Sequence, residues 1–449
     1  MEVANKNVLV VGLGKSGIAA ALFLKSRGAQ VTVSDSKPRE QFGDELSLLL
    51  DRGIAIETGG HGERTFREQD LIVVSPGVPF DAPLLQQARA MGENVIGEIE
   101  LAAQFFPGRI IAITGSNGKT TTTALTGAII SAGDFHTLVG GNIGTPAISL
   151  VNDATPETIA VLEVSSFQLE TIQSYRPYIA TVLNITPDHL DRHRTFAAYA
   201  AAKARIFENQ RQDDFAVLNA DDPACVSLAG SAKSRLFWFS RKKVVAQGAF
   251  VRDARIFFRD AGNETEIIPL NEISLKGSHN VENVLAAASA GMLMGCDPAK
   301  IRKAIGEFKA VEHRLEYVAT IGGVAFYNDS KATNVDATIK AIESFPANIH
   351  LILGGKDKGS DYSVLNDLLR QRVKRVYTIG AAADKIESQT KETVEIVHAE
   401  TLDAAVKRAA KAAQPGDIVL LAPACASFDQ FQNYEHRGKT FKEIVKALV

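Results

Sequence analysis

The chain has 449 residues, a formal net charge of −3 and 45% hydrophobic residues, a composition typical of a globular protein of two or three domains. No excess of basic residues attracts nucleic acid and no apolar run is long enough to cross a membrane, so we expect neither as a partner. The three cysteines are widely scattered, which argues against a disulfide framework or a zinc site and for a reducing compartment. Because no basic region with a cleavable apolar segment opens the sequence, we expect a cytoplasmic protein.

The first hundred residues alternate short apolar strands with helical segments. The strand Asn7–Val11 runs directly into the glycine-rich sequence GLGKSG, and a second strand ends at Asp35, the spacing at which a Rossmann unit places its ribose-binding acid. On its own this pattern indicates NAD binding, with a tight turn that holds no ligand as the alternative. A further strand near 70–75 extends the pattern, so residues 1–99 are predicted to form a Rossmann-like domain around an open parallel sheet.

A phosphate-binding loop follows in the sequence RIIAITGSNGKTTTT, residues 109–123. The β-branched run Ile110–Ile113 predicts a buried strand, and the residues after the loop favour a helix. The glycines let backbone N–H groups face an anion, Lys119 can reach the outer phosphates, and the Thr120 hydroxyl can bind Mg²⁺. The loop departs from the usual P-loop pattern because Ile113 stands in place of the first glycine, and a polar turn without a ligand is the alternative. We predict a nucleoside triphosphate site made by Gly115, Ser116, Asn117, Gly118, Lys119, Thr120 and Thr121.

Further polar groups follow the next strands of this central region. One apolar strand ends on Glu163, the position at which an NTPase holds its metal. The next strand runs into TPDHLDRH, a segment crowded with groups that bind metals or transfer protons. The helical stretch after it carries Lys203, and a lysine on such a helix is most often a solvated side chain. With a smaller β-rich part at 215–269, residues 100–310 are predicted to form a central P-loop ATPase-type domain with a parallel sheet.

The last part, residues 311–449, is predicted to be a C-terminal Rossmann-like α/β domain. Three polar clusters, NDSKATN, GGKDKG and PACASFDQF, each follow a predicted strand. They should therefore share the carboxyl edge of a parallel sheet, where ligands bind. One such lysine alone is as often a solvated surface charge, but three polar clusters at one edge favour a site for an anionic substrate.

Together these motifs resemble the Mur ligases of peptidoglycan synthesis. The similarity spans the whole chain and rests on TGSNGKTT, GGNIG, LEVSSFQLE, NITPDHLDRH, EHRLE, NDSKATN and PACASFDQFQNYEHRG. The P-loop, the glutamate after the strand, DHLDRH and EHR would also admit folylpolyglutamate synthetases. The combination of FQLE, DSKATN and ACASFDQF is typical of the family member that adds D-glutamate to UDP-N-acetylmuramoyl-L-alanine. A regulatory nucleotide switch is the alternative from another class, and it leaves the clusters of the last domain unexplained.

The resemblance implies an ATP-dependent acid–amino-acid ligase that works through an acyl phosphate with two Mg²⁺ ions, and we expect a monomer. It assigns the first domain to the UDP of the substrate rather than to NAD. The implied UDP-substrate contacts are Gly14, Lys15, Ser16, Asp35, Ser36, Lys37, Asn142 and Ser165.

The resemblance also implies the reacting groups. The lysine matching Lys203 is carbamylated by CO₂ in this family, which turns a cation into an anionic metal ligand. The implied catalytic residues are Lys119, Glu163, His189 and Lys203, and the implied magnesium ligands are Thr120, Glu163, His189 and the Lys203 carbamate. His313, Arg314 and Asp329 would complete the ATP site. D-Glutamate would be held by Lys331, Thr333, Lys358, Ser427 and Phe428.

Overall fold

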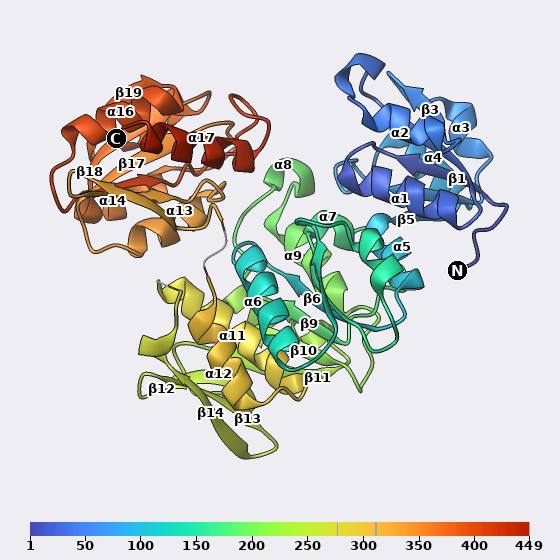
Figure 1. Cartoon of the computed structure of the whole chain (residues 1–449), viewed down its shortest axis with the longest axis horizontal. Helices are drawn as coiled ribbons and strands as arrows, with labels where there is room; N and C mark the ends of the chain where they lie inside the picture. The colour runs from blue at the N-terminus through green and yellow to red at the C-terminus, as the bar shows by residue number, and fades with distance from the viewer. Residues whose placement is uncertain (276, 310–311, 449) are drawn as a thin grey trace. The chain divides into compact units, whose positions relative to one another are not determined.

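The computed structural model describes residues 1–275, 277–309 and 312–448 (Figure 1). These residues form three α/β parts, each built on one sheet, so the three-domain α/β fold predicted from the sequence is confirmed. By their contacts they gather into two compact units. The first unit is Met1–Ile185, Ala200–Asn271 and Asn283–Ile305, and the second is Thr186–Tyr199, Glu272–Glu282 and Gly306–Val449. The predicted boundary at 310–311 lies outside the described residues.

The N-terminal part is built on a parallel sheet that has five strands among the described residues, in the order β3-β2-β1-β4-β5. The strands are β1 (Asn7–Val11), β2 (Gln30–Asp35), β3 (Ala55–Thr58), β4 (Leu71–Val74) and β5 (Val95–Gly97). The helices are α1 (Lys15–Ser26), α2 (Glu45–Asp51), α3 (Glu63–Arg67), α4 (Pro83–Ala90) and α5 (Glu98–Phe105). Short runs of Val, Ile and Leu make the central strands β1 and β4, because a strand covered on both faces is apolar along its length.

The central part has a nine-stranded sheet among the described residues, in the order β14-β13-β12-β11-β10-β9-β6-β8-β7. Its strands are β6 (Arg109–Thr114), β7 (Thr137–Gly141), β8 (Ile159–Glu163), β9 (Ile179–Val182), β10 (Phe215–Asn219), β11 (Arg235–Ser240), β12 (Gly248–Arg252), β13 (Arg255–Asp260) and β14 (Asn263–Pro269). The pairs from β7 to β12 are parallel, whereas β12, β13 and β14 pair antiparallel. This antiparallel extension is the β-rich part predicted from the sequence.

The helices of this central region vary in length. They are α6 (Lys119–Ala132), α7 (Ser166–Leu169), α8 (Leu190–His193), α9 (Phe196–Ala204), α10 (Pro223–Ser227), α11 (Ser278–Leu293) and α12 (Pro298–Glu307). The sequence pattern placed the helix of Lys203 from residue 199 onward, but α9 begins three residues earlier, at Phe196. Thr195 accounts for this earlier start, because its hydroxyl accepts the N–H of Ala198 at 3.1 Å, as an N-cap does.

The C-terminal part has a six-stranded sheet among the described residues, in the order β15-β16-β20-β17-β18-β19. Its strands are β15 (Glu316–Ile321), β16 (Val324–Asn328), β17 (Ile349–Gly354), β18 (Val373–Ile379), β19 (Glu395–Glu400) and β20 (Ile418–Leu421). Its helices are α13 (Val335–Glu343), α14 (Asn366–Arg372), α15 (Ala383–Thr390), α16 (Leu402–Ala412) and α17 (Tyr434–Lys446). The edge strands β15 and β19 were not predicted, because both carry polar residues between their apolar ones.

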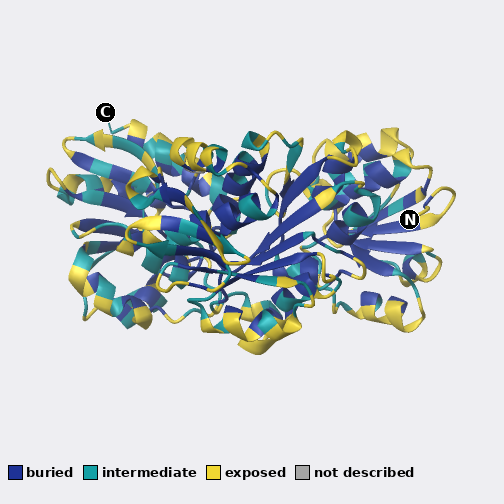
Figure 2. Ribbon diagram, turned by 90° about the horizontal axis from the view of Figure 1, so that it is seen from below, coloured by how far each residue is buried: buried dark blue, intermediate teal, exposed yellow. Residues whose placement is uncertain are grey.

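The strands carry the hydrophobic cores, and the exposed residues gather on the outer faces of the helices and in loops (Figure 2). On the six-stranded sheet, Ile352 and Leu421 pack toward one face and Leu351 and Leu420 toward the other, and all four are 0% exposed. Burying such a side chain contributes about 1.5–3 kcal/mol. Among the described residues, no helix is both long enough and apolar enough to span a membrane.

Candidate active site

The loop between β6 and α6 is held in shape by residues from elsewhere in its unit. The Asn184 side chain accepts a hydrogen bond from the backbone N–H of Asn117 at 2.8 Å and donates one to the backbone carbonyl of Asn117 at 3.1 Å. Gly118 has φ of +84°, and a Cβ there would lie 2.3 Å from the Asn283 side-chain oxygen. A side chain at this position would therefore be strained and would clash, so the glycine is needed for the loop to close.

Lys119 lies at the start of α6 and bends back over this loop. Its ammonium donates to the carbonyl oxygens of Gly115 and Ser116, each at 2.9 Å. An arriving phosphate offers the same ammonium fully charged oxygens, which are stronger acceptors than neutral carbonyls. The geometry therefore suits a lysine that transfers from the loop to the outer phosphates of a nucleotide.

Two predicted residues bind the carboxylate of a third, Glu163, at the end of β8. Glu163 is 1% exposed. Its Oε2 accepts the Thr120 hydroxyl at 2.8 Å, and its Oε1 accepts the Asn142 amide at 3.0 Å. A hydroxyl and a carboxylate beside a phosphate-binding loop are oxygen ligands of the kind that Mg²⁺ prefers, so these residues fit the predicted metal.

Lys203 is not the solvated side chain that its helix alone suggests. It is 1% exposed, and its ammonium donates to the Gly115 carbonyl at 2.8 Å and to the Thr114 hydroxyl at 3.4 Å. Helix α9 therefore brings this lysine to the phosphate-binding loop. Its pairing with this loop accounts for its burial, because a lysine is almost never fully buried unless it is paired.

In the N-terminal part, both carboxylate oxygens of Asp35 are used by the backbone. They accept the N–H groups of Leu13 at 2.7 Å and of Lys37 at 2.9 Å, so this acid joins the glycine-rich loop after β1 to the end of β2. Gly14 is the N-cap of α1, and no atom lies within 4 Å of the position its Cβ would take. The remaining predicted contacts of this part are partly or fully exposed at the same sheet edge: Lys15, Ser16, Ser36 and Lys37.

Ser165, the other predicted substrate contact of the first unit, forms the N-cap of α7. It makes a capping box with Gln168, in which each side chain satisfies a backbone N–H of the other. Its hydroxyl also contacts the Gln168 side-chain oxygen at 3.0 Å. A contact to substrate would therefore require this hydroxyl to share or exchange its present partners.

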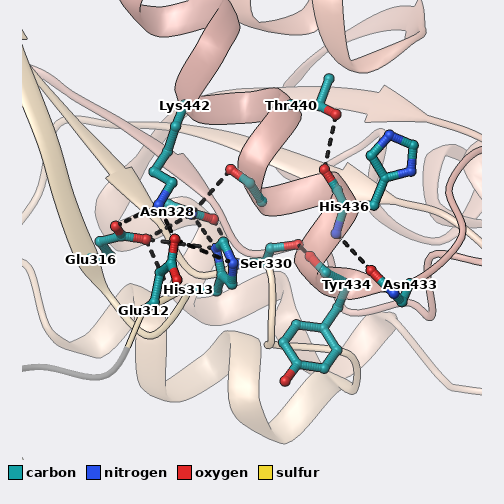
Figure 3. Close-up of polar contacts among 11 residues, drawn as sticks. Glu312, His313, Glu316, Asn328, Ser330, Asn433, Tyr434, His436, Thr440 and Lys442 are labelled. Atoms are coloured by element: carbon teal, nitrogen blue, oxygen red, sulfur yellow. Dashed lines mark hydrogen bonds and ion pairs between the residues drawn. The ribbon is translucent and has the colours of Figure 1, made fainter. Parts of the chain in front are cut away.

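In the second unit, the predicted nucleotide residues are His313, which Figure 3 shows among its polar partners, and Arg314 and Asp329, whose charges interact. His313 is 3% exposed, and its Nδ1 lies 2.9 Å from the Asn328 amide nitrogen. Asp329 is buried, which raises the pKa of its carboxyl to about 6, while the charge of Arg314 opposes that shift. Within the described residues, Asp329 Oδ1 and Arg314 Nε have no hydrogen-bond partner. Both atoms suit a polar ligand.

The predicted D-glutamate residues follow three strand ends of this unit. The Lys358 ammonium binds Asp188 Oδ1 at 3.3 Å, and Asn334 donates to Asp188 Oδ2 at 2.9 Å. The Lys331 ammonium lies 5.0 Å from the centre of the Tyr434 ring. The others differ in exposure: Thr333 is partly buried, Ser427 is 2% exposed and Phe428 is 67% exposed.

His189, the predicted ligand of a second Mg²⁺, belongs to the second unit by its contacts. Its Nε2 lies 3.7 Å from Asp188 Oδ2, and its backbone has a left-handed φ of +54°. His189 therefore lies beside Asp188 in the second unit, whereas the other proposed metal ligands, Thr120, Glu163 and Lys203, belong to the first unit.

Sequence reasoning missed several residues that shape these sites. Asn184 and Asn283 support the phosphate-binding loop, Asp188 holds Lys358, and Arg437 is a fully buried cation. The Arg437 guanidinium donates to Ser330 and to the carbonyls of Cys425 and Ala426. All of these residues except Asn283 lie inside motifs quoted for the resemblance, but only their distant partners reveal what they do.

The sequence matches three family models, described as the Mur ligase MurD-like N-terminal domain at residues 6–97, the Mur ligase middle domain at 113–291 and the Mur ligase glutamate ligase domain at 313–425. Among curated relatives, UDP-N-acetylmuramoylalanine–D-glutamate ligase of Koribacter versatilis is 66% identical over 100% of this chain and 99% of its own. The enzyme of the same name from Acidobacterium capsulatum is 61% identical over 100% of this chain and 97% of its own.

Solved structures share the fold at low identity. UDP-N-acetylmuramate-alanine ligase MurC of Thermotoga maritima has a TM-score of 0.62 at 20% identity, covering 99% of this chain and 100% of its own. MurF ligase of Thermotoga maritima, solved with ADP, has a TM-score of 0.61 at 17% identity, covering 100% of this chain and 97% of its own. Family models that cover all three parts, and full-length identity of 66% to a curated relative, establish that the chain belongs to the Mur ligase family.

Proposed function

We propose that this chain is an ATP-dependent ligase that adds D-glutamate to UDP-N-acetylmuramoyl-L-alanine in peptidoglycan precursor synthesis. The observation that carries the proposal is identity of 66% and 61% over its full length to two relatives named for this reaction. The geometry supports the chemistry, because Lys119 and Lys203 both donate to the Gly115 carbonyl of the phosphate-binding loop and Glu163 accepts the Thr120 hydroxyl.

The first half-reaction is phosphoryl transfer. The carboxylate of the L-alanyl group attacks the γ-phosphorus of ATP, the bond to the β-phosphate oxygen breaks, and ADP leaves. Catalysis here is mainly positioning and neutralisation of charge. Lys119 and the loop N–H groups would hold the β- and γ-phosphates. Mg²⁺ held by Thr120 and Glu163 would supply further positive charge to those oxygens.

The second half-reaction forms the amide. The D-glutamate amine attacks the carbonyl carbon of the acyl phosphate, inorganic phosphate leaves from the tetrahedral intermediate, and the amine loses a proton. Lys358, Lys331, Thr333, Ser427 and Phe428 are the proposed contacts of the amino acid. Support comes from Lys358, because this ammonium already binds a carboxylate, that of Asp188.

A second Mg²⁺, ligated by His189 and a Lys203 carbamate, is part of the proposal. Forming the carbamate requires the neutral amine to attack CO₂ with loss of one proton. The position of Lys203, which is buried against the phosphate-binding loop, supports this role. For the N-terminal part we propose that Gly14, Lys15, Ser16, Asp35, Ser36 and Lys37 contact the UDP group, together with Asn142 and Ser165 of the central part. We further propose that the protein acts as a cytoplasmic monomer.

Phosphate release tests the function. We expect release only when ATP, UDP-N-acetylmuramoyl-L-alanine and D-glutamate are all present, and little release when L-glutamate replaces D-glutamate. Release with a folate acceptor would indicate a folylpolyglutamate synthetase instead. ATP hydrolysis that ignores both acceptors would indicate a nucleotide switch and contradict the proposal.

A further inference from the structure

Asn328, the last residue of β16, makes hydrogen bonds to three separate parts of the second unit and is 0% exposed. Its Oδ1 accepts the N–H of Ser330 at 3.1 Å. Its amide nitrogen lies 2.9 Å from His313 Nδ1, 3.0 Å from Glu316 Oε2 and 3.3 Å from the Gly438 carbonyl oxygen (Figure 3). The residue therefore joins the turn at His313, strand β15 and helix α17.

These partners fix which way the amide group points. The Ser330 N–H can only donate, so the atom facing it must be the amide oxygen. Glu316 and the Gly438 carbonyl can only accept, so the atom facing them must be the NH₂ group. In the reverse orientation, the NH₂ group would face the Ser330 N–H, and the amide oxygen would face the Glu316 and Gly438 oxygens.

This orientation also decides the protonation of His313. The NH₂ group has two hydrogens, and its two shortest contacts are His313 Nδ1 at 2.9 Å and Glu316 Oε2 at 3.0 Å. Nδ1 therefore accepts, which leaves the single proton of the neutral ring on Nε2. Burial lowers the pKa of His313. The other charges that act on the ring are those of Glu312, just before β15, Glu316, on β15, and Glu435 and Lys442, on α17. Lys442 binds both Glu312 and Glu316, and its positive charge offsets the stabilisation that these carboxylates would give to a doubly protonated, cationic ring.

The turn that follows His313 needs such support. His313 and Leu315 have left-handed φ values of +64° and +42°, and each such residue costs about 1 kcal/mol or more. The Glu316 carboxylate accepts the His313 N–H at 2.9 Å. A Cβ on Gly438 would lie 2.3 Å from His313 Nδ1, so α17 packs closely against the ring. Asn328 binds the ring, the carboxylate and the helix, and thus braces the turn from three sides.

We infer that Asn328 is a positioning residue of the nucleotide corner: it holds His313 as the neutral ring protonated on Nε2, and so holds the turn that presents Arg314. The nucleotide part of this inference rests on the proposed ATP-binding role of that corner. The protonation part stands independently of any activity.

Nitrogen-15 NMR of histidine-labelled full-length protein tests the protonation directly, with His313→Gln used to identify the signal. We expect His313 Nδ1 to show the shift of an unprotonated ring nitrogen and Nε2 that of a protonated one at neutral pH. A wild-type ring protonated on Nδ1 would overturn the inference whether or not Asn328→Asp folds.

Asn328→Asp sharpens the test, because the new carboxylate can only accept and has nearly the same shape. We expect Nδ1 to become protonated and the titration midpoint of His313 to rise by about one pH unit or more. Asn366→Asp is the matched control, since Asn366 lies at the start of α14 in the same unit and its amide donates to the Gln389 carbonyl. An unchanged His313 signal in Asn328→Asp would contradict the inference.

Kinetics test the consequence for the nucleotide. Asn328→Asp should raise KM for ATP about tenfold while KM for D-glutamate stays within about twofold, and Asn366→Asp should change neither. Equal KM for ATP in Asn328→Asp and wild type would overturn the positioning role. Failure of the proposed function would show separately, as wild-type protein without D-glutamate-dependent phosphate release, and would leave the NMR result intact.

Discussion

The phosphate-binding loop of the first unit and the strand-end corner of the second unit, meaning the turn at His313 and the loops after β16, β17 and β20, are built in contrasting ways. In the loop, the groups proposed to hold ATP lie within the seven residues Gly115–Thr121, and Glu163 joins them through Thr120. In the corner, the proposed groups come from loops more than a hundred residues apart, and Asn328 and Arg437 connect them. The first site has most of its proposed nucleotide groups in one segment, which Asn184 and Asn283 support from outside. A site made by several loops depends on the buried residues that tie the loops together.

The largest expected effect is at the single-segment site. Lys119→Ala should lower kcat at least about a thousandfold, because neutralising the phosphates is the main source of catalysis in phosphoryl transfer. Lys300→Ala is the control, since this lysine of the same unit pairs with Asp134 and is partly exposed. Steady-state phosphate release measures both. A folded Lys119→Ala protein with near-normal kcat would remove the loop from the mechanism.

Lys203 tests whether a buried group from another helix is as essential as the loop itself. Lys203→Ala should lose about a hundredfold in kcat and regain part of it with added acetate, because a small carboxylate can replace the carbamate. Lys203→Arg keeps the positive charge, cannot be carbamylated and fills the space, so it should not be rescued. Mass spectrometry of gently ionised wild-type protein in bicarbonate should show one added CO₂. Full activity in Lys203→Ala would mean that the lysine is structural.

The strand-end corner should respond with a change in substrate affinity. Lys358→Ala and Ser427→Ala should each raise KM for D-glutamate about ten- to a hundredfold and leave KM for ATP within about twofold, since each removes a hydrogen bond to a carboxylate. Lys374→Ala is the control, because Lys374 binds Asp417, next to the opposite end of the same sheet. Equal increases in both KM values would contradict the assignment to D-glutamate.

These differences also explain how much the sequence could predict. The strand, glycine loop and helix around Lys119 follow from a local pattern, and so do the parallel sheets, because short apolar strands alternate with helical segments. The burial of Lys203 could not be read from its own helix, whose pattern favours a solvated lysine. Asp188 and Asn328 lie in motifs that the sequence singles out, but their roles could not be predicted, because they depend on partners up to 170 residues away. Edge strands such as β15 were missed because their apolar pattern is weak.

The last prediction concerns stability rather than activity, at helix α5, where two buried carboxylates differ. Glu100 accepts hydrogen bonds from Ser174, Tyr175 and other donors, and although burial opposes it, these bonds lower its pKa. Glu98 binds the N–H of Ile148 through one oxygen, while its other oxygen has no partner within the described residues. Burial accordingly raises the pKa of Glu98 to about 7.

A raised carboxyl pKa means that the folded state binds the proton more tightly than the unfolded state. The free energy of unfolding should therefore fall as pH rises from about 4.5 toward about 7, by at most about 3 kcal/mol, and then level off. Glu98→Gln should flatten this dependence and be the more stable protein at pH 8, whereas Glu100→Gln should destabilise. Denaturant unfolding at several pH values measures this, and identical curves for Glu98→Gln and wild type would refute it.

The Asp188 carboxylate between Lys358 and Asn334 has a consequence for anyone seeking inhibitors of this protein. A carboxylate fixed to the chain competes at a far higher effective concentration than most free ligands reach. If Lys358 binds D-glutamate, an acidic fragment can bind it only in those molecules in which Asp188 has released Lys358. The apparent affinity of the fragment is then its intrinsic affinity multiplied by that fraction of molecules. Screening wild-type protein alone would therefore undervalue small dicarboxylates. Screening an Asp188→Asn protein in parallel would separate compounds that bind Lys358 weakly from compounds that are displaced by the Asp188 carboxylate.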